Sequence, residues 1–176
     1  EATCVKKYKR ACATLYLLPK NTIMYHLQND TSADLTEYRL GSAGATALAE
    51  GLKHKSCRIE ILKVSGCDID DTGGAALAET TTKTTRLRQL DMSKNTLGHR
   101  TAVALSRGFR LKNGLSSLNL ANTGVGNMFL PLFARAIKKS KSHLTNLNIS
   151  KCKLNDKGCK ALSIALASCQ KLQNII

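Results

Sequence analysis

Apolar residues recur along this chain in a fixed template of eleven positions. Each copy is apolar at positions one, four, six and eleven, and it carries a small polar residue or a cysteine at position nine. The copies begin at Ile59, Leu87, Leu115 and Leu144, which lie 28, 28 and 29 residues apart. Apolar residues two apart within each copy predict a short strand, because alternate side chains of a strand share one face.

A helical pattern follows each template. Apolar residues four apart, such as Leu105 and Phe109, lie on one face of a helix, and alanines beside them let that face approach a sheet closely. Side chains that can accept hydrogen bonds from free N–H groups recur where each helix should begin. We therefore expect four residues to cap the helices of their own repeats: Ser42, Asp71, Asn127 and Asp156.

The template resembles the leucine-rich repeat, and a unit of about 28 residues with one strand and one helix resembles its ribonuclease-inhibitor type. The resemblance implies an α/β fold, a right-handed solenoid or horseshoe with a parallel inner sheet and outer helices. In position nine, Asn95 is predicted to bridge backbone groups of neighbouring turns. Cys67, Thr123 and Cys152 are predicted to supply a weaker form of that bond.

The domain organisation follows from where the template stops. Residues 1–30 lack it, and helical spacing broken by Pro19 predicts an N-terminal helical cap. Residues 31–176 hold repeats of about 28–29 residues, the last of them incomplete and opening at Leu172 and Ile175. An uncovered apolar sheet edge is unfavourable, so we expect the native chain to continue past it or a partner to cover it.

Template positions three, five and seven should face the concave side of the sheet. This surface is polar and carries no Trp, Tyr or Arg, the residues that dominate binding hot spots. It is either a solvated inner sheet or a docking floor on which Lys63 and Asp91 fix the register of a bound segment. The candidate protein-binding residues are Asp34, Ile61, Lys63, Gln89, Asp91, Asn119, Asn146 and Asn148.

Charge is the other unusual feature, with 27 Lys and Arg against 12 Asp and Glu, a net charge of +15. Basic residues gather at helix ends and in the loops that follow; cations there offset the helix dipole, which explains their placement but not their excess. The candidate basic edge comprises Lys53, Lys55, Arg58, Arg86, Arg110, Lys112, Lys138, Lys139 and Lys141, and the same clusters contain Arg107 and Arg135.

A positive stripe would attract a partner with an acidic surface. An acidic protein is favoured over nucleic acid, the runner-up, because Tyr and Phe fall mainly in the cap and on core positions and form no stacking platform among the charges. Tight binding to nucleic acid with a steep salt dependence would favour the runner-up.

Catalytic and metal sites find little support. The four histidines sit in separate units, and no glycine-rich phosphate loop follows a strand. His54 and Cys57 lie close in the sequence, but two ligands are too few for a zinc site. We therefore expect no enzyme activity, no metal and no cofactor. Seven cysteines without a C-x-x-C pair indicate reduced thiols and a cytoplasmic protein. No apolar run approaches the roughly 20 residues that a membrane span needs, so membrane insertion is not expected.

The N-terminal segment narrows the resemblance. Tyr8-x-x-Ala11-Cys12, followed by Pro19 and Ile23, is similar to the opening of leucine-rich repeat proteins of ciliated and germ-line cells. A related protein is the leucine-rich subunit of the axonemal dynein regulatory complex. The resemblance implies a non-catalytic scaffold or adaptor in a cytoskeletal or ciliary assembly. The wider class includes the sensor ends of NACHT-type immune receptors, so a ligand-sensing repeat region is the alternative.

Overall fold

The computed structural model describes residues 2–84, 86–111, 114–137, 143–169 and 171–176. Two helices, α1 (Thr3–Thr14) and α2 (Asn21–Asn29), precede an alternation of strands and helices. The strands are β1 (Ser32–Asp34), β2 (Ile61–Lys63), β3 (Gln89–Asp91), β4 (Ser117–Asn119), β5 (Asn146–Asn148) and β6 (Asn174–Ile175). The helices between and after them are α3 (Gly41–Leu52), α4 (Asp71–Lys83), α5 (His99–Arg110), α6 (Gly126–Ile137) and α7 (Asp156–Ser168).

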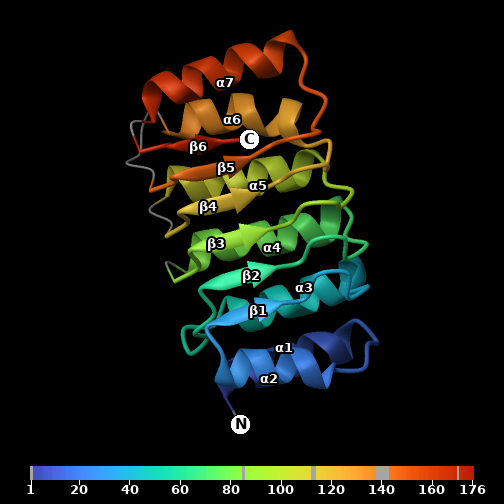
Figure 1. The fold of residues 1–176 in the computed structure, drawn as a ribbon. Coiled ribbons are helices and arrows are strands. Elements are labelled where there is room, and N and C mark those ends of the chain that lie inside the picture. The colour runs from blue at the N-terminus through green and yellow to red at the C-terminus, as the bar shows by residue number, and fades with distance from the viewer. Residues whose placement is uncertain (1, 85, 112–113, 138–142, 170) are drawn as a thin grey trace.

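The six strands form one parallel sheet in the order of the sequence (Figure 1). Its register aligns equivalent template positions, so that Leu62 pairs with Leu90, Leu90 with Leu118 and Leu118 with Leu147. Helices α3 to α7 form the second layer. The α/β leucine-rich repeat fold predicted from the sequence is thus confirmed.

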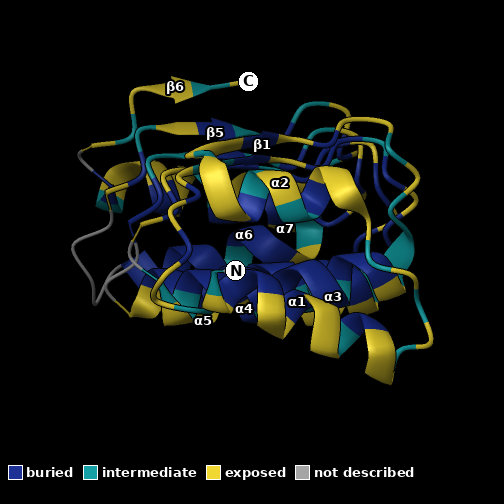
Figure 2. Cartoon of the chain, turned by 90° about the horizontal axis from the view of Figure 1, so that it is seen from below, coloured by how far each residue is buried: buried dark blue, intermediate teal, exposed yellow. Residues whose placement is uncertain are grey.

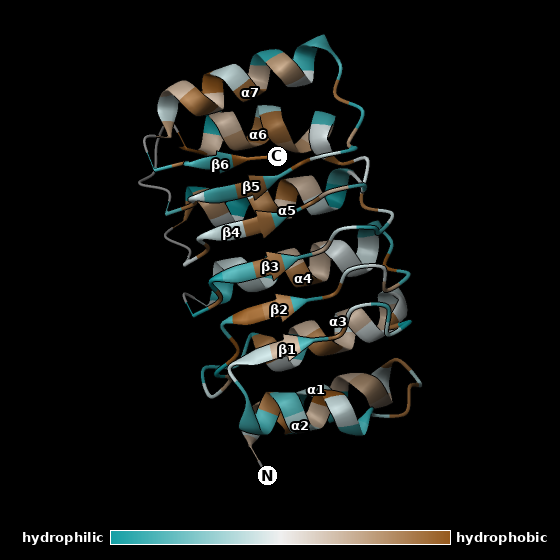
Figure 3. Ribbon diagram, in the orientation of Figure 1, coloured by the Kyte–Doolittle hydropathy of each residue, from teal (hydrophilic) through white to brown (hydrophobic). Residues whose placement is uncertain are grey.

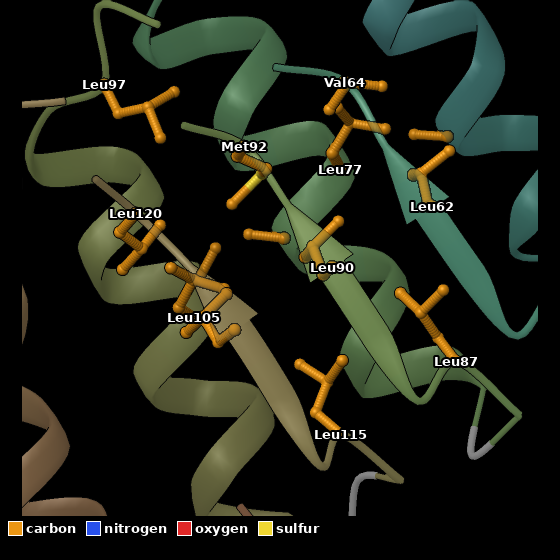
Figure 4. Close-up of a cluster of buried hydrophobic side chains, with 14 of the residues drawn as sticks. Leu62, Val64, Leu77, Leu87, Leu90, Met92, Leu97, Leu105, Leu115 and Leu120 are labelled. Atoms are coloured by element: carbon orange, nitrogen blue, oxygen red, sulfur yellow. The ribbon is translucent and has the colours of Figure 1, made fainter. Parts of the chain in front are cut away.

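The core lies between the sheet and the helices, and Figure 2 shows buried residues concentrated there. Leucines at equivalent positions stack from one repeat to the next (Figure 4). Leu90 and Met92 of one turn pack with Leu77 and Leu105 from the flanking helices, and all four are almost fully buried. Burial of each such side chain contributes roughly 1.5–3 kcal/mol to the free energy of unfolding. A single repeat could not bury these side chains without its neighbours.

Asn95 performs the bridging role predicted for position nine. Its amide oxygen accepts hydrogen bonds from the Cys67 and Ile69 N–H groups of the preceding repeat, at 3.1 and 3.0 Å. Its amide nitrogen donates to the Val64 carbonyl of that repeat at 2.8 Å and to the carbonyls of Met92 and Ser93. The side chain is buried, so these bonds satisfy groups that water cannot reach.

Cysteine replaces asparagine in two turns and makes a simpler bridge. The Cys67 thiol donates to the Leu35 carbonyl at 2.8 Å, and the Cys152 thiol donates to the Leu120 carbonyl at 3.1 Å. Burial raises the pKa of Cys67, which keeps this thiol protonated and able to donate at neutral pH. Thr123 instead bonds the Leu120 carbonyl of its own turn.

The expected helix caps were wrong in position. The side-chain caps come one residue earlier: the Asp70 carboxylate accepts from the N–H groups of Thr72 and Gly73, and Asn155 accepts from that of Gly158. These residues lie just outside their helices, where the backbone is extended. The residues expected as caps were Ser42, Asp71, Asn127 and Asp156.

Three of those four side chains instead reach the following repeat. The Asp71 carboxylate accepts hydrogen bonds from the N–H groups of Gly98, Arg100 and Thr101, at 2.8–2.9 Å, and so caps α5 from the start of α4. Gly98 makes this possible, because a Cβ there would lie 2.9 Å from the Asp71 carboxyl carbon. Single bonds of the same kind join Ser42 to the Asp70 N–H and Asn127 to the Asn155 N–H.

The first two helices cover the N-terminal end of the core. Helix α1 packs against α3 in the helix layer, and α2 lies beside β1, as Figures 1 and 2 show. Tyr8 of α1 is almost fully buried, and its hydroxyl accepts a hydrogen bond from the Lys20 N–H at 3.1 Å. Both helices match the segments expected to be helical on either side of Pro19.

Candidate functional site

The sheet surface away from the helices holds a shallow hollow that spans β2 to β6. Six of the eight predicted concave residues line it, and Asp34 and Ile61 lie beside it on β1 and β2. We call these six, with Ser117, the concave floor: Lys63, Gln89, Asp91, Ser117, Asn119, Asn146 and Asn148. Figure 3 shows polar residues dominating β3 and β5 on this surface, whereas β2 is largely apolar.

Position five of the template has a structural task that the sequence analysis missed. In four strands its side-chain oxygen accepts a hydrogen bond from the N–H group two residues further on. This turn ends the strand and begins the loop towards the helix. The acceptors, at 2.9–3.1 Å, are Asp34, Asp91, Asn119 and Asn148.

Charges on this surface are largely matched. The Lys63 ammonium lies 3.0 Å from the Asp34 carboxylate, and the Asn119 amide donates to Asp91 at 2.8 Å. The Thr36 hydroxyl and then Lys63 lower the pKa of Asp34 to about 2. Lys63 and Asp91 sit opposite each other in the β2–β3 register. The floor therefore offers mainly amide donors and acceptors, with little net charge.

The side chains at template position three are the ones most available to a ligand. Gln89 is exposed, and its side chain makes no hydrogen bond to any residue that the structure describes. Asn146 is exposed and accepts a hydrogen bond from the Asn174 amide at 3.0 Å. Ser117 lies half-buried between them in the register. Held on a rigid sheet, these side chains can pair with backbone or side-chain amides of a bound segment.

The candidate basic edge is more varied than its sequence suggests. Lys53 is neutralised by Glu50 at 2.8 Å and by Glu79 at 3.4 Å. The Arg58 guanidinium donates to the Asn29 carbonyl at 2.9 Å. The exposed members are Lys55, Arg58, Arg86 and Arg110, and Figure 1 places the loops that follow the helices along one side of the solenoid. Lys112, Lys138, Lys139 and Lys141 lie outside the described residues.

The histidines do not come together. His26 lies 2.7 Å from Asp30, His54 contacts Ser56, and His143 lies 3.4 Å from Lys171. Within the described ranges, no group of three or more His, Cys, Asp or Glu residues could hold a metal ion. In the same part of the chain, no helix is both long and apolar enough to cross a membrane.

Comparison with known proteins agrees with this architecture. The family model described as "Leucine Rich repeat" matches residues 55–78 and 140–163. The chain is 30% identical over 171 residues to mouse NACHT, LRR and PYD domains-containing protein 14, covering 96% of this chain and 16% of that protein. It is 33% identical over 136 residues to mouse ribonuclease inhibitor, covering 74% of this chain and 29% of the inhibitor.

A solved structure shares the fold at low sequence identity. The leiomodin-1 actin-binding site 2 structure superposes with a TM-score of 0.68 at 15% identity, covering 84% of this chain and 89% of that one. The chain thus spans less than a third of these two sequence relatives. It is a ribonuclease-inhibitor-like leucine-rich repeat protein, related to the repeat regions of the NACHT, LRR and PYD proteins. The ciliary branch is not among these relatives.

Proposed function

We propose that this ribonuclease-inhibitor-like leucine-rich repeat chain is a non-catalytic protein-binding module that acts in the cytoplasm. The observation that carries the proposal is the concave floor, where polar side chains from the four consecutive strands β2 to β5 project from one sheet. Leucine-rich repeat domains typically serve as protein-interaction modules. The floor suits a polar segment of a partner protein, and a net charge of +15 favours a partner with an acidic surface.

Two settings fit this function. The first is the cytoskeletal or ciliary assembly implied by the N-terminal segment, and leiomodin-1, whose actin-binding site shares this fold, is a precedent for such a setting. The second is the repeat region of a larger NACHT-type receptor, suggested by the relatives in that class. Co-sedimentation with actin filaments and with microtubules tests the first setting.

Blocking the floor should weaken partner binding. We predict that the double variant Gln89→Arg/Ser117→Arg reduces capture of the partner from native extract by roughly tenfold, because two long charged side chains would fill the hollow. Both positions lie on the sheet surface outside the hydrogen bonds that hold the turns. Quantitative mass spectrometry of captured proteins, with cross-linking to locate the contact, measures the effect.

The matched control is Gln28→Arg/Ser163→Arg. It adds the same two charges on exposed positions of α2 and α7, far from the floor. Proteins that bind through the floor should be lost with the floor variant and retained with this control. If both variants retain every captured protein, the concave floor is not the binding surface.

A further inference from the structure

A second surface lies on the helix side of the molecule. Helices α5 and α6 pack side by side, and three arginines line the groove between them: Arg107 and Arg110 from α5 and Arg135 from α6. All three side chains are exposed. The rest of the groove is formed by small or apolar residues, namely Val103, Ser106, Leu132 and Ala136. We call this the arginine groove.

The arginine groove has no internal counter-charge. No ion pair or hydrogen bond joins the three guanidinium groups to any described residue, and neither helix contains Asp or Glu. One and two repeats earlier, the position of Arg107 is occupied by Glu79 and Glu50, which neutralise Lys53. The same ridge thus carries two carboxylates around one lysine at α3 and α4, and only cations at α5 and α6.

Three arginines around one depression suit a particular anion. Guanidinium groups present paired N–H donors in a planar fork, which matches the oxygens of phosphate and carboxylate groups. A phosphate monoester carries nearly two negative charges and three acceptor oxygens, so it can occupy several forks at once. Val103 and Leu132 add apolar surface beside the guanidinium groups, against which the carbon atoms of a bound side chain can pack.

The shape and surroundings of the groove favour a protein source for that phosphate. The phenylalanines of these helices, Phe109, Phe129 and Phe133, are all buried, so no aromatic platform is available for nucleic-acid bases. A groove between two helix ridges admits a side chain carried on an extended segment, whereas the flat surface of a bilayer would rest on the ridges.

We propose that the arginine groove binds a phosphoserine or phosphothreonine on a protein partner, with Arg107, Arg110 and Arg135 as its ligands. Phosphorylation of that partner would then switch on a contact at the helix face. The arginine groove lies on the opposite layer from the concave floor and does not depend on it. Loss of one function therefore leaves the other open to measurement.

The test uses the whole chain and a fluorescein-labelled peptide of glycine and serine that contains two phosphoserines. Fluorescence anisotropy at about 0.15 M salt should show binding of this peptide and at least tenfold weaker binding of its unphosphorylated form, since each lost charge-assisted hydrogen bond costs a factor of about ten. The triple variant R107Q/R110Q/R135Q should lose at least about tenfold in affinity for the phosphopeptide.

Two control variants separate geometry from charge. K6Q/K20Q/K157Q removes three exposed charges elsewhere and should change affinity less than about twofold. R107K/R110K/R135K keeps the charge but removes the forked donors, and should weaken binding several-fold. Thermal unfolding of each variant checks that it is folded; if the triple glutamine variant is not, R110Q alone replaces it.

Three results would overturn the proposal. One is an equal loss of affinity in the groove and control variants, which would indicate non-specific attraction. Another is equal binding of the phosphorylated and unphosphorylated peptides. The third is arginine-dependent binding of single-stranded RNA, or of phosphatidylcholine vesicles containing a phosphoinositide, in the absence of peptide binding.

Discussion

At the scale of single residues, Asn95 shows how one side chain ties two repeats together. An asparagine amide offers two donor hydrogens and an accepting oxygen on one small planar group. Here the oxygen accepts hydrogen bonds from two N–H groups of the previous turn, and the nitrogen donates to carbonyls of the previous turn and of its own. A thiol or hydroxyl can supply only one donor, so Cys67 and Cys152 each bridge to the preceding turn with a single bond, and Thr123 donates within its own turn.

This difference leads to a stability prediction. Asn95→Ala should lower the free energy of unfolding by about 3 kcal/mol or more, because it leaves buried N–H groups of Cys67 and Ile69 and the Val64 carbonyl without partners. Thr123→Ala, at the same template position, should cost only about 1 kcal/mol, since Thr123 donates one bond within its own turn. Urea denaturation measures both. Equal losses would show that the bridge adds nothing.

Local backbone geometry was less visible in the sequence. Equivalent residues three positions after each strand from β1 to β5 adopt left-handed backbone angles, with φ of 55–61°. Gly66 and Asn122 are suited to this conformation, but the other members are not. They are Glu37, Lys94 and Lys151. The hydrogen bond from position five fixes the turn, so tertiary geometry overrides the preference of the residue.

At the scale of elements, Asp71 links two consecutive helices. It belongs to the first turn of α4, yet its carboxylate accepts hydrogen bonds from the N-terminal N–H groups of α5. Burial alone would raise the pKa of Asp71, but the N–H groups of Thr101, Arg100 and Gly98 outweigh it and the pKa is lowered. The folded state therefore prefers the ionised carboxylate, which also suits the positive end of the α5 dipole.

Asp71→Ala should lower the free energy of unfolding by about 2 kcal/mol at pH 7. Because the folded pKa lies below the ordinary value of about 4, the contribution of Asp71 is present above pH ~4 and disappears as the pH falls below it. The difference between wild type and variant should shrink towards pH 2. Thermal or urea unfolding at several pH values measures it.

Asp156→Ala provides the comparison at the equivalent position of α7. Asp156 is exposed, and its carboxylate makes no hydrogen bond to any described residue, so its loss should cost less than about 1 kcal/mol, from the helix dipole alone. A loss as large as that of Asp71→Ala would contradict the cross-repeat role of Asp71.

At the scale of the whole molecule, stability is the sum of neighbouring contacts. Each helix packs mainly on the helices before and after it, as α4 does on α3 and α5. The N-terminal end and the α5–α6 region differ in their largest buried side chains. Tyr8 fills the N-terminal end, whereas Phe109 and Phe133 pack with ring centres 4.9 Å apart between α5 and α6. A destabilising substitution should therefore weaken mainly the helices next to it.

Hydrogen exchange can test this. Tyr8→Ala and Phe133→Ala should each cost roughly 3–5 kcal/mol. Exchange should accelerate in α1, α2 and α3 for the first variant and in α5, α6 and α7 for the second. Acceleration spread evenly over all helices in both variants would show that the chain unfolds as one cooperative unit instead.

Sequence periodicity by itself determined the repeat, the strand–helix alternation and the register of Leu62, Leu90, Leu118 and Leu147, because burial of one apolar face per unit leaves one way to stack the copies. It also determined the structural role of Asn95. Only the tertiary structure decided the cross-repeat capping by Asp71, the neutralisation of Lys53 and the grouping of Arg107, Arg110 and Arg135. These depend on which side chains of different repeats come within hydrogen-bonding distance, and a template within one repeat carries no information about such distances.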